Sequence, residues 1–371
     1  MNIPSFHQND LFNELTKHFD KVEVIYAHEY DENRKLQGWN FEIAQNYPSK
    51  IIGKKFNILE LVKYTFSNRK SVHIVNGIWA ETSFFFVIML LNLFKANFLI
   101  YSEAPIATKK RTLIKKILLE LLVKPLSKLL IIGAKGFLAV SISGVDYFQF
   151  LGVHPRKIYR FGYFRNVKVT SEKSSKNQTT ELIFVGQLID LKGIKTLLEA
   201  VKVVSESNRL FHLTIVGTGE LAPFLANFVE KNQLQKLVTL VGVVNSEHVI
   251  HYFEKADLLI FPSTGDGWGM VVNEALQSCV PVLISDQCGA RELIIDDYNG
   301  LIFKGKDVES LTKNLLKFLD LPFEKREILK THAGEMGEKI SVPIVGNYLS
   351  ACIKHALNPN FLKPTAPWLN D

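Results

Sequence analysis

The sequence predicts an α/β protein built from two doubly wound, Rossmann-like domains. The chain has 371 residues, which is more than a domain with a single hydrophobic core usually contains. This length fits two domains of roughly 150–180 residues each. Short β-rich runs alternate with helical patterns, as is typical of βαβ units around a parallel sheet. A polar segment near the middle of the chain, SEKSSKNQTT, contains almost no apolar residue and is expected to be an exposed linker.

In the first half of the chain, β-rich runs and helical patterns alternate four times. The expected strands are residues 22–27, 72–76, 97–102 and 137–141. The expected helices are residues 11–18, 58–66, 84–94 and 113–130. Pro125 is expected to kink or split the last of these helices, because its ring removes a backbone donor.

The alternation resumes after the linker. The expected strands are residues 182–185, 211–216, 238–240, 258–261, 281–284 and 301–303. The expected helices are residues 195–204, 221–231, 270–278, 308–319, 325–339 and 345–356. The chain is therefore expected to divide into an N-terminal domain, a linker, a second domain, and a C-terminal helix with its tail, at residues 1–165, 166–180, 181–345 and 346–371.

Composition narrows the class of protein. Hydrophobic residues make up 47% of the chain and charged residues 22%, which is typical of a globular protein. The three cysteines form no CxxC pair and no even disulfide set, which indicates a reducing compartment. The N-terminus lacks the basic and apolar regions of a signal peptide, and the longest apolar run is too short to cross a bilayer. We therefore expect a cytoplasmic protein.

Positive charge is concentrated in residues 109–135. Against the single acid Glu120, this stretch carries Lys109, Lys110, Arg111, Lys115, Lys116, Lys124, Lys128 and Lys135. Charges recur every fourth residue along an otherwise apolar helical pattern, which fits a bilayer interface or an amphipathic core helix. We favour peripheral contact with the anionic inner face of the cytoplasmic membrane. Nucleic acid is disfavoured as a partner, because the run lacks interleaved aromatic residues that stack on bases.

Two glycine-containing loops follow strands early in the second domain. In FVGQLIDLKG, Gly186 ends a strand and Lys192 precedes a helix whose free N–H groups favour an anion such as phosphate. In TIVGTGE, Gly217 begins a tight turn, but the third glycine of a dinucleotide fingerprint is missing, which argues against a nicotinamide dehydrogenase. Taken alone, each loop also fits an ordinary surface turn.

The strongest pattern is PSTGDGWGMVVNEALQSCVPV, in which seven residues separate Asp266 from Glu274. Gly267 and Gly269 let backbone N–H groups approach a ligand where a helix begins. If all eight steps were helical, the acids would lie about 12 Å apart, comparable to the reach from a sugar across a diphosphate to a ribose. Each acid then accepts hydrogen bonds from hydroxyls at one end of such a ligand. The alternative is a capping acid and a solvated helix acid.

This stretch resembles the acid-x7-acid motif of retaining glycosyltransferases, particularly family 4 of the GT-B fold. The matching residues are Pro-Ser at 262–263, Asp-Gly-Trp-Gly at 266–269, Glu-Ala at 274–275 and Pro-Val at 281–282. The resemblance extends over residues 182–303 with several motifs in order. It implies two Rossmann-like domains facing a cleft, with the C-terminal helix returning to the N-terminal domain.

The resemblance also implies a site for a nucleotide-diphosphate sugar in the second domain. Its residues would be Gly186, Gln187, Lys192, Gly217, Asp266, Gly267, Trp268, Gly269, Glu274, Gly289 and Arg291. Gly289 lies in SDQCGAREL, which is similar to the turn that lies beside the donor diphosphate in the family. The family often has Arg at the position of Gln187, which carries no charge. Lys192, together with Arg291, is therefore expected to neutralise more of the negative charge of the diphosphate.

The N-terminal domain is expected to hold the acceptor. Glu103 follows the strand at 97–102, near where many family members carry a His, and is a candidate base or a carboxylate that stabilises positive charge at the anomeric carbon. An ordinary loop acid is the equal alternative. His7 and Gln8, in the loop expected at 3–10, are the acceptor-side candidates. The catalytic candidates are thus Asp266, Glu103 and Lys192.

The expected activity is hexosyl transfer with retention, from a nucleotide-diphosphate sugar to a glycan or lipid-linked glycan, in cell-surface polysaccharide biosynthesis. No metal and no cofactor is expected, because the chain has no Asp-x-Asp motif and the resemblance implies that Lys192, helix N-termini and backbone amides hold the leaving diphosphate. A nucleotide-sugar epimerase of the same fold and a non-catalytic glycosyltransferase-like subunit remain alternatives. The donor base, the sugar, the acceptor, the linkage and the oligomeric state stay open.

Overall fold

The computed structural model describes residues 4, 6–28, 45–51, 58–78, 82–104, 124–167, 179–245 and 247–369. The chain divides into two compact units. The described part of unit 1 lies within Met1–Asp31, Ile43–Tyr163 and Val342–Asp371, and that of unit 2 within Phe164–Ser341. The C-terminal segment that belongs to unit 1 thus begins at Val342, ahead of the boundary expected at 346.

Unit 1 is built on a parallel sheet with the strand order β3-β4-β5-β6. Its strands are β3 (Val72–Asn76), β4 (Asn97–Ser102), β5 (Gly136–Val140) and β6 (Ile158–Phe161). A separate parallel pair joins β1 (Val24–Tyr26) to β2 (Ser49–Ile51). The helices between these strands are α3 (Ile58–Ser67), α4 (Thr82–Leu93), α6 (Lys124–Ile131) and α7 (Ser141–Phe150), and η2 (Pro155–Lys157) precedes β6.

One buried core lies between this sheet and helices α4, α6 and α7. Ile88 of α4 and Phe148 of α7 share it with Phe98, Ile100 and Phe137 from the sheet. Because β3 to β6 are parallel and follow one another in order, right-handed crossovers put the connecting helices on the same face of the sheet. The buried sides of these helices therefore face the sheet and their other sides face outward.

Helices from the two ends of the chain pack together in unit 1. Helix α1 (Phe6–Leu15) lies against α14 (Val342–Leu357), which also contacts β4 and β5, and η5 (Pro367–Leu369) follows. A Cβ on Gly346 of α14 would lie 2.7 Å from the Glu14 side chain, so the two helices approach closely. The expected return of the C-terminal helix to the N-terminal domain is confirmed.

One expectation for unit 1 was wrong. The loop expected at 3–10 is largely helix, since α1 begins at Phe6 and holds residues 7 and 8. Pro125 lies in α6, and the residues directly before α6 lie outside the described residues, so its expected kink or split stays a prediction. The first part of the helix expected at 113–130 lies outside the described residues.

Unit 2 contains a six-stranded parallel sheet with the order β12-β11-β10-β7-β8-β9. Its strands are β7 (Thr180–Val185), β8 (Phe211–Val216), β9 (Val238–Gly242), β10 (Leu258–Phe261), β11 (Val282–Ser285) and β12 (Gly300–Phe303). The chain runs outward from β7 to β9, and then continues on the other side of β7 from β10 to β12. The strand order therefore reverses between β7 and β10, where doubly wound sheets bind their ligands.

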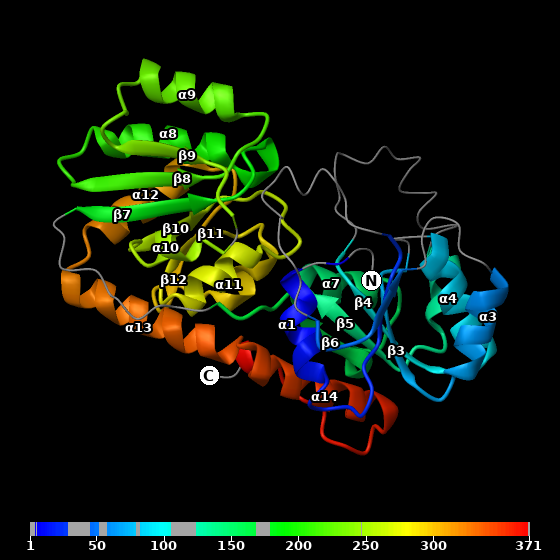
Figure 1. The fold of residues 1–371 in the computed structure, drawn as a ribbon. Helices are drawn as coiled ribbons and strands as arrows, with labels where there is room; N and C mark the ends of the chain where they lie inside the picture. Colours follow the sequence, from blue (N-terminus) through cyan, green and yellow to red (C-terminus); the bar gives the residue numbers. More distant parts are fainter. Residues whose placement is uncertain are drawn as a thin grey trace. The chain divides into compact units, whose positions relative to one another are not determined.

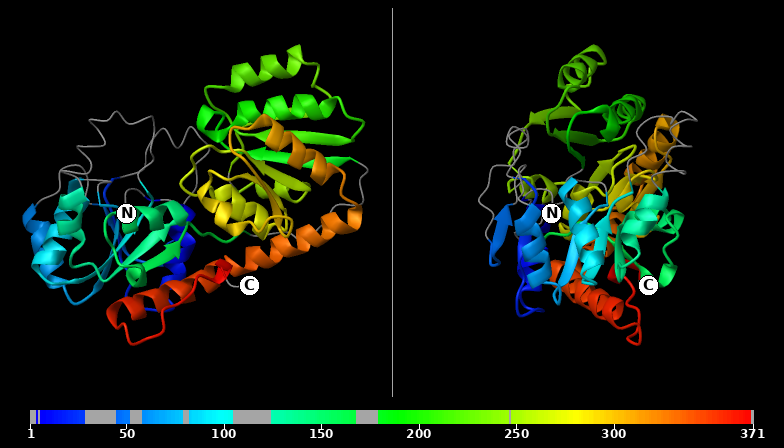
Figure 2. Two further views of the ribbon diagram at one scale, coloured as in Figure 1. Left: turned by 180° about the vertical axis from the view of Figure 1, so that it is seen from behind. Right: turned by 90° about the vertical axis from the view of Figure 1, so that its right-hand side faces the viewer.

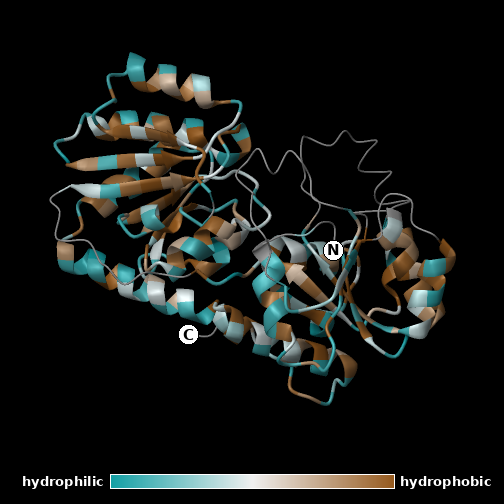
Figure 3. Ribbon diagram, viewed as in Figure 1, coloured by the Kyte–Doolittle hydropathy of each residue, from teal (hydrophilic) through white to brown (hydrophobic). Residues whose placement is uncertain are grey.

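Helices cover both faces of this sheet (Figure 1). Helices α8 (Ile194–Ser205), α9 (Ala222–Lys231) and α12 (Val308–Leu319) share one large core with the strands, and α12 lies beside α8 (Figure 2). Helix α11 (Met270–Gln277) lies on the other face, with α13 (Phe323–Lys339) packed along it. A short α10 (Ile250–Phe253) precedes β10. Figure 3 shows hydrophobic residues along the strands of this sheet.

Candidate functional site

Loops at the carboxyl edge of the unit 2 sheet touch one another backbone to backbone. A Cβ on Gly193, after β7, would lie 2.0 Å from the carbonyl oxygen of Pro262, after β10. A Cβ on Gly217, after β8, would lie 1.9 Å from the carbonyl oxygen of Gly186. Only glycine fits at such distances, so these glycines serve loop-to-loop packing, and their predicted role in ligand access stays a prediction.

Lys192 and Asp266 meet at the point where the strand order reverses. Lys192 ends η3 (Asp190–Lys192), just before α8, and Asp266 lies in the loop after β10. The Lys192 Nζ donates a hydrogen bond to Oδ2 of Asp266, and 19% and 18% of the two side chains are exposed. The predicted phosphate-binding cation and the predicted sugar-binding acid are therefore partners in an ion pair at the expected ligand position.

The loop that carries Asp266 is held by the segment after β11. The Gly289 N–H, at the start of η4 (Gly289–Leu293), donates to the Asp266 carbonyl oxygen at 3.0 Å. The Ala290 N–H and the Cys288 thiol both donate to the Trp268 carbonyl oxygen, at 2.8 and 2.9 Å. A Cβ on Gly289 would lie 1.9 Å from the Gly267 carbonyl oxygen, so this contact requires glycine.

Trp268 is a core residue. Its side chain is 1% exposed, its Nε1–H donates to Oδ1 of Asn273 at 2.9 Å, and its ring lies edge-on to Phe164. The indole is thus enclosed by protein, and Trp268 contributes to the predicted donor site through its backbone and by packing. Helix α11 begins only after Gly269, which has a φ of 104°. The eight steps from Asp266 to Glu274 are therefore not all helical, and the 12 Å estimate does not hold.

Glu274, on α11, forms an ion pair with Arg165. The Arg165 Nη1 lies 3.2 Å from the Glu274 Oε1. The backbone of Arg165 is held by the same helix, because the Gln277 Nε2–H donates to its carbonyl oxygen at 2.9 Å and Gln277 Oε1 accepts from the Val167 N–H at 2.8 Å. Burial raises the pKa of Glu274, and the charge of Arg165 acts in the opposite direction. Arg165 carries no sequence motif, and only the structure places it beside a predicted site residue.

Replacing Arg165 should shift the pH dependence of diphosphate binding. With its pKa raised, Glu274 is protonated as the pH falls through that pKa, and a protonated carboxyl is a weaker acceptor for the hydroxyl hydrogen bonds predicted for it. Arg165→Gln removes the opposing charge, so the pKa of Glu274 rises further and binding weakens at a higher pH than in the wild type. Calorimetric titration with a nucleoside diphosphate at several pH values measures this.

Arg165→Lys is the matched control, because it keeps the positive charge. In this variant, diphosphate binding should weaken at the same acidic pH as in the wild type. Identical pH profiles for Arg165→Gln and the wild type would show that Arg165 does not act on Glu274 ionisation.

The other predicted donor residues differ in burial. Gln187, directly after Gly186, is half-buried next to the glycine contacts. Arg291 lies on η4 with its side chain exposed, and among the contacts within the described residues none joins its side chain to Asp266 or Lys192. The structure therefore brings Lys192 and Asp266 together directly and leaves Arg291 outside this pair.

In unit 1, Gln8 and Glu103 both interact with Tyr101. Gln8 is buried on α1 and its side chain acts to lower the pKa of Tyr101, while Glu103 follows the end of β4. Burial raises the pKa of the Tyr101 hydroxyl well above its usual value, and nearby Tyr163 and the charge of Glu103 raise it further. This phenol donates to the Gly162 carbonyl oxygen at 3.0 Å. Two of the three unit 1 candidates thus share one neighbour; the side chain of the third, His7, lies outside the described residues.

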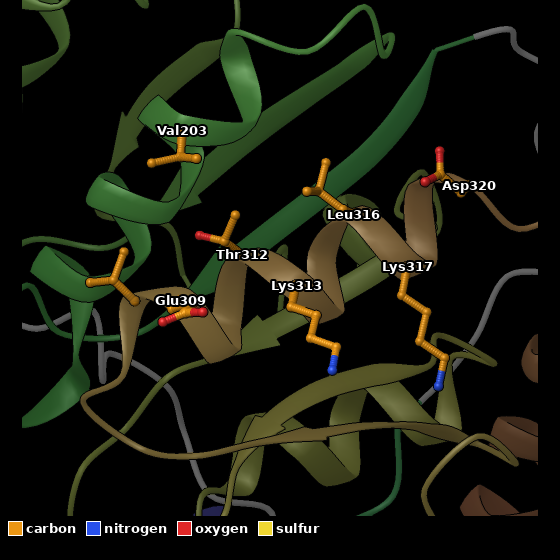
Figure 4. A pocket seen from close by; sticks show the side chains of 8 residues that line it. Val203, Glu309, Thr312, Lys313, Leu316, Lys317 and Asp320 are labelled. Atoms are coloured by element: carbon orange, nitrogen blue, oxygen red, sulfur yellow. The ribbon is translucent and has the colours of Figure 1, made fainter.

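An open groove between α8 and α12 lies apart from these residues (Figure 4). Its lining includes Val203, Thr312 and Leu316 along the helices, with Lys317 and Asp320 at one end. Lys317 pairs with Asp297, and Asp320 accepts two hydrogen bonds from Arg209. None of the predicted site residues lines this groove.

The architecture is that of GT-B glycosyltransferases. The chain superimposes on the apo form of the lipopolysaccharide outer core galactosyltransferase WaaB with a TM-score of 0.69 at 13% identity, covering 97% of this chain and 100% of that one. It superimposes on Anabaena HepE in complex with UDP with a TM-score of 0.71 at 13% identity, covering 95% of this chain and 100% of that one. The predicted α/β fold class is confirmed.

Residues 167–336 match the family model of glycosyl transferases group 1. An uncharacterized glycosyltransferase of Methanocaldococcus jannaschii is 30% identical over 159 residues, 43% of this chain and 42% of that protein. The amylovoran biosynthesis glycosyltransferase AmsK of Erwinia amylovora is 28% identical over 173 residues, which are 45% of this chain and 40% of that protein. The matched region thus spans about two fifths of each relative. The family-4-like GT-B resemblance of the acid-x7-acid stretch is confirmed.

Within the described residues, no helix is long and apolar enough to cross a membrane.

Proposed function

We propose that the protein transfers a hexosyl group from a nucleotide-diphosphate sugar to a hydroxyl of a glycan or lipid-linked glycan, with retention at the anomeric carbon. The observation that carries this proposal is the Lys192–Asp266 pair at the point of strand-order reversal, with Glu274 one helix turn into α11. The solved structure of HepE contains UDP, which supports a nucleoside diphosphate as the ligand. The names of AmsK and of the putative colanic acid biosynthesis glycosyltransferase WcaL support a role in polysaccharide biosynthesis.

In this proposal, donor binding exchanges the partners of Lys192. The diphosphate takes the Lys192 ammonium, together with backbone N–H groups at the start of α8 and α11. The Asp266 carboxylate is then released from its ion pair and accepts hydrogen bonds from hydroxyls of the donor sugar. Glu274, held by Arg165, accepts from the ribose hydroxyls.

Bond cleavage at the anomeric carbon places negative charge on the departing diphosphate and positive charge on the sugar ring. Lys192 and the helix N-termini stabilise the first charge, and carboxylates stabilise the second. Departure of the diphosphate is assisted on the face that the acceptor attacks, which retains the configuration. Glu103, whose charge acts on Tyr101, is the unit 1 candidate for the base or for a carboxylate that stabilises positive charge at the anomeric carbon. The reaction as proposed uses no metal and no cofactor.

Product analysis with a radiolabelled nucleotide sugar tests the activity. Transfer of label to an acceptor supports the proposal. Isomerised donor without transfer would identify an epimerase instead, and unchanged donor that still binds would identify a non-catalytic subunit.

Lys192→Ala should weaken binding of free uridine diphosphate by roughly 10- to 150-fold, because a charge-assisted hydrogen bond to phosphate contributes about 1.5–3 kcal/mol. The variant also leaves the Asp266 carboxylate unpaired next to the diphosphate, which adds repulsion. Isothermal titration calorimetry measures the change.

Lys195→Ala is the matched control. Lys195 lies three residues further along, and it pairs with Asp190 at 2.7 Å at the surface, with 47% of its side chain exposed. Its replacement should leave the diphosphate affinity within about twofold of the wild type, since exposed pairs contribute little. An unchanged affinity in Lys192→Ala, or an equal loss in Lys195→Ala, would mean that Lys192 does not contact the diphosphate.

We also propose that residues 109–135 contact anionic lipid on the inner face of the cytoplasmic membrane, in a cytoplasmic protein. The concentration of basic residues in this stretch supports the proposal. The structure describes only its last part, which includes α6.

A further inference from the structure

Three helices of unit 1 expose a band of large apolar side chains. These side chains are between 36% and 74% exposed, and they are Leu59 and Phe66 on α3, Phe86, Met89 and Leu93 on α4, and Leu126, Leu129 and Ile132 on or just after α6. On α4 they recur with the spacing of one helical stripe, opposite the buried Ile88 and Leu91. Figure 3 colours much of α4 in the hydrophobic range. We call this band the α3–α4–α6 face.

The three helices lie side by side, so the stripes adjoin. The Asn92 Nδ2–H of α4 donates to the Leu130 carbonyl oxygen of α6 at 2.7 Å, and its Oδ1 accepts from the Gly133 N–H at 3.0 Å. On the other flank, the rings of Phe66 and Phe94 meet edge-on at 5.3 Å. Hydrogen bonds on the α6 side and a ring contact on the α3 side place α4 between the two helices. The apolar side chains therefore form one surface rather than scattered exposures.

Positive charge accompanies this face. Residues 58–70, 82–96 and 124–135 contain one acid, Glu60, against the cations Lys63, Arg69, Lys70, Lys95, Lys124, Lys128 and Lys135. Among the described residues, no carboxylate forms an ion pair with any of these cations. The Arg69 guanidinium lies 4.3 Å from the centre of the Phe66 ring, so charge directly borders the apolar surface.

We propose that the α3–α4–α6 face docks on an anionic phospholipid bilayer. At a bilayer interface, apolar side chains enter the boundary between headgroups and acyl chains, while Lys and Arg reach lipid phosphates. A second copy of this chain would cover the apolar band as well, but it would bring the same cationic surplus into contact and repel. A negatively charged lipid surface can both bury the apolar side chains and neutralise the positive charge.

This inference does not depend on sugar transfer. The face shares α6 with the stretch 109–135 proposed above, but α3 and α4 supply most of its apolar side chains.

The test measures binding of the full chain to vesicles. Co-sedimentation with phosphatidylcholine vesicles that contain phosphatidylglycerol is compared with pure phosphatidylcholine vesicles, at low and high salt. The wild type should bind the anionic vesicles, and less strongly at high salt. The triple variant Met89→Gln, Leu93→Gln, Leu129→Gln should bind at least about tenfold more weakly, since each side chain loses apolar burial in the interface. These residues are exposed, so the melting temperature and the affinity for uridine diphosphate should stay at wild-type values.

The matched control is Leu210→Gln with Leu362→Gln, two exposed leucines at 62% and 92% that lie outside the face. This double variant should bind vesicles like the wild type. A variant with Lys109, Lys110, Lys115 and Lys116 changed to Gln separates the face from the neighbouring basic stretch.

Four results would overturn the proposal. They are equal wild-type binding to neutral and anionic vesicles, wild-type binding by the triple variant, an equal loss in the leucine control, and a loss confined to the lysine variant. Light scattering adds one more: a wild-type dimer that the triple variant converts to monomer would make the face a self-association site. Because uridine diphosphate binding is measured in parallel, failure here is distinguishable from failure of the sugar-transfer proposal.

Discussion

Asp266→Asn should lower kcat by roughly 30-fold or more, which corresponds to about 2 kcal/mol of transition-state stabilisation, whereas Glu274→Gln should mainly raise the donor KM. The proposed partner of Asp266 is the donor sugar, whose ring gains positive charge as the diphosphate leaves, so this interaction strengthens in the transition state. Ribose hydroxyls change little during the reaction, so Glu274 contributes nearly uniform binding. Steady-state kinetics with varied donor separate the two effects.

Free uridine diphosphate is the internal control for the acid pair, because it retains the ribose and lacks the sugar. Its affinity should fall in Glu274→Gln. In Asp266→Asn the affinity should hold or rise, since Lys192 is freed from its ion pair. If both variants bind the diphosphate and turn over as the wild type does, the two acids are only a loop acid and a helix acid, and the proposed function loses its main support.

Gly217→Ala should destabilise unit 2 by about 2–5 kcal/mol and weaken diphosphate binding in the fraction that folds. The residue has a φ of 135°, and its Cβ would lie 1.9 Å from the Gly186 carbonyl oxygen. The obstacle is backbone rather than a flexible side chain, so the loops after β7 and β8 must move apart. That movement disturbs the end of β7, from which the chain leads to Lys192. Thermal unfolding and diphosphate titration measure the two effects.

Gly242→Ala is the control for this substitution. Gly242 also has a positive φ, 82°, and its carbonyl oxygen accepts from the Gly217 N–H at 2.8 Å, but a Cβ there would meet nothing within 4 Å. Its replacement carries the strain of the backbone conformation alone, about 1–2 kcal/mol. Equal destabilisation by both substitutions would show that the contact between the β7 and β8 loops does not require glycine.

Unit 2 could be predicted closely because its signals are local. The strands at Phe211–Val216 and Leu258–Phe261 and the helix at Val308–Leu319 have the bounds expected from the sequence. Each is a run of strong periodicity or continuous apolar character that ends near turn residues. The acid-x7-acid stretch and the motifs around it indicated the family before any contact was known, because motif spacing is a property of the chain itself.

Unit 1 was harder to predict because its first helix lacks such signals. Helix α1 has no acid in its first turn and no base in its last turn, and it packs on α14, more than 300 residues away in the chain. Packing against a distant segment outweighed the weak local preference, so the expected loop is a helix. The same limit applies to Tyr101 of β4, on which Gln8 of the distant helix α1 acts.

The sequence by itself determined the fold class, the family and the residue types of the candidate donor site, since periodicity and motif spacing are read along the chain. The tertiary structure alone decided the partners. Lys192 meets Asp266 across 74 residues of sequence, Arg165 meets Glu274 across 109, and the indole of Trp268 faces the core. The physical reason is that ion pairing and burial depend on which loops the folded sheet brings together. The identity of a residue does not specify how far it lies from a residue on another loop.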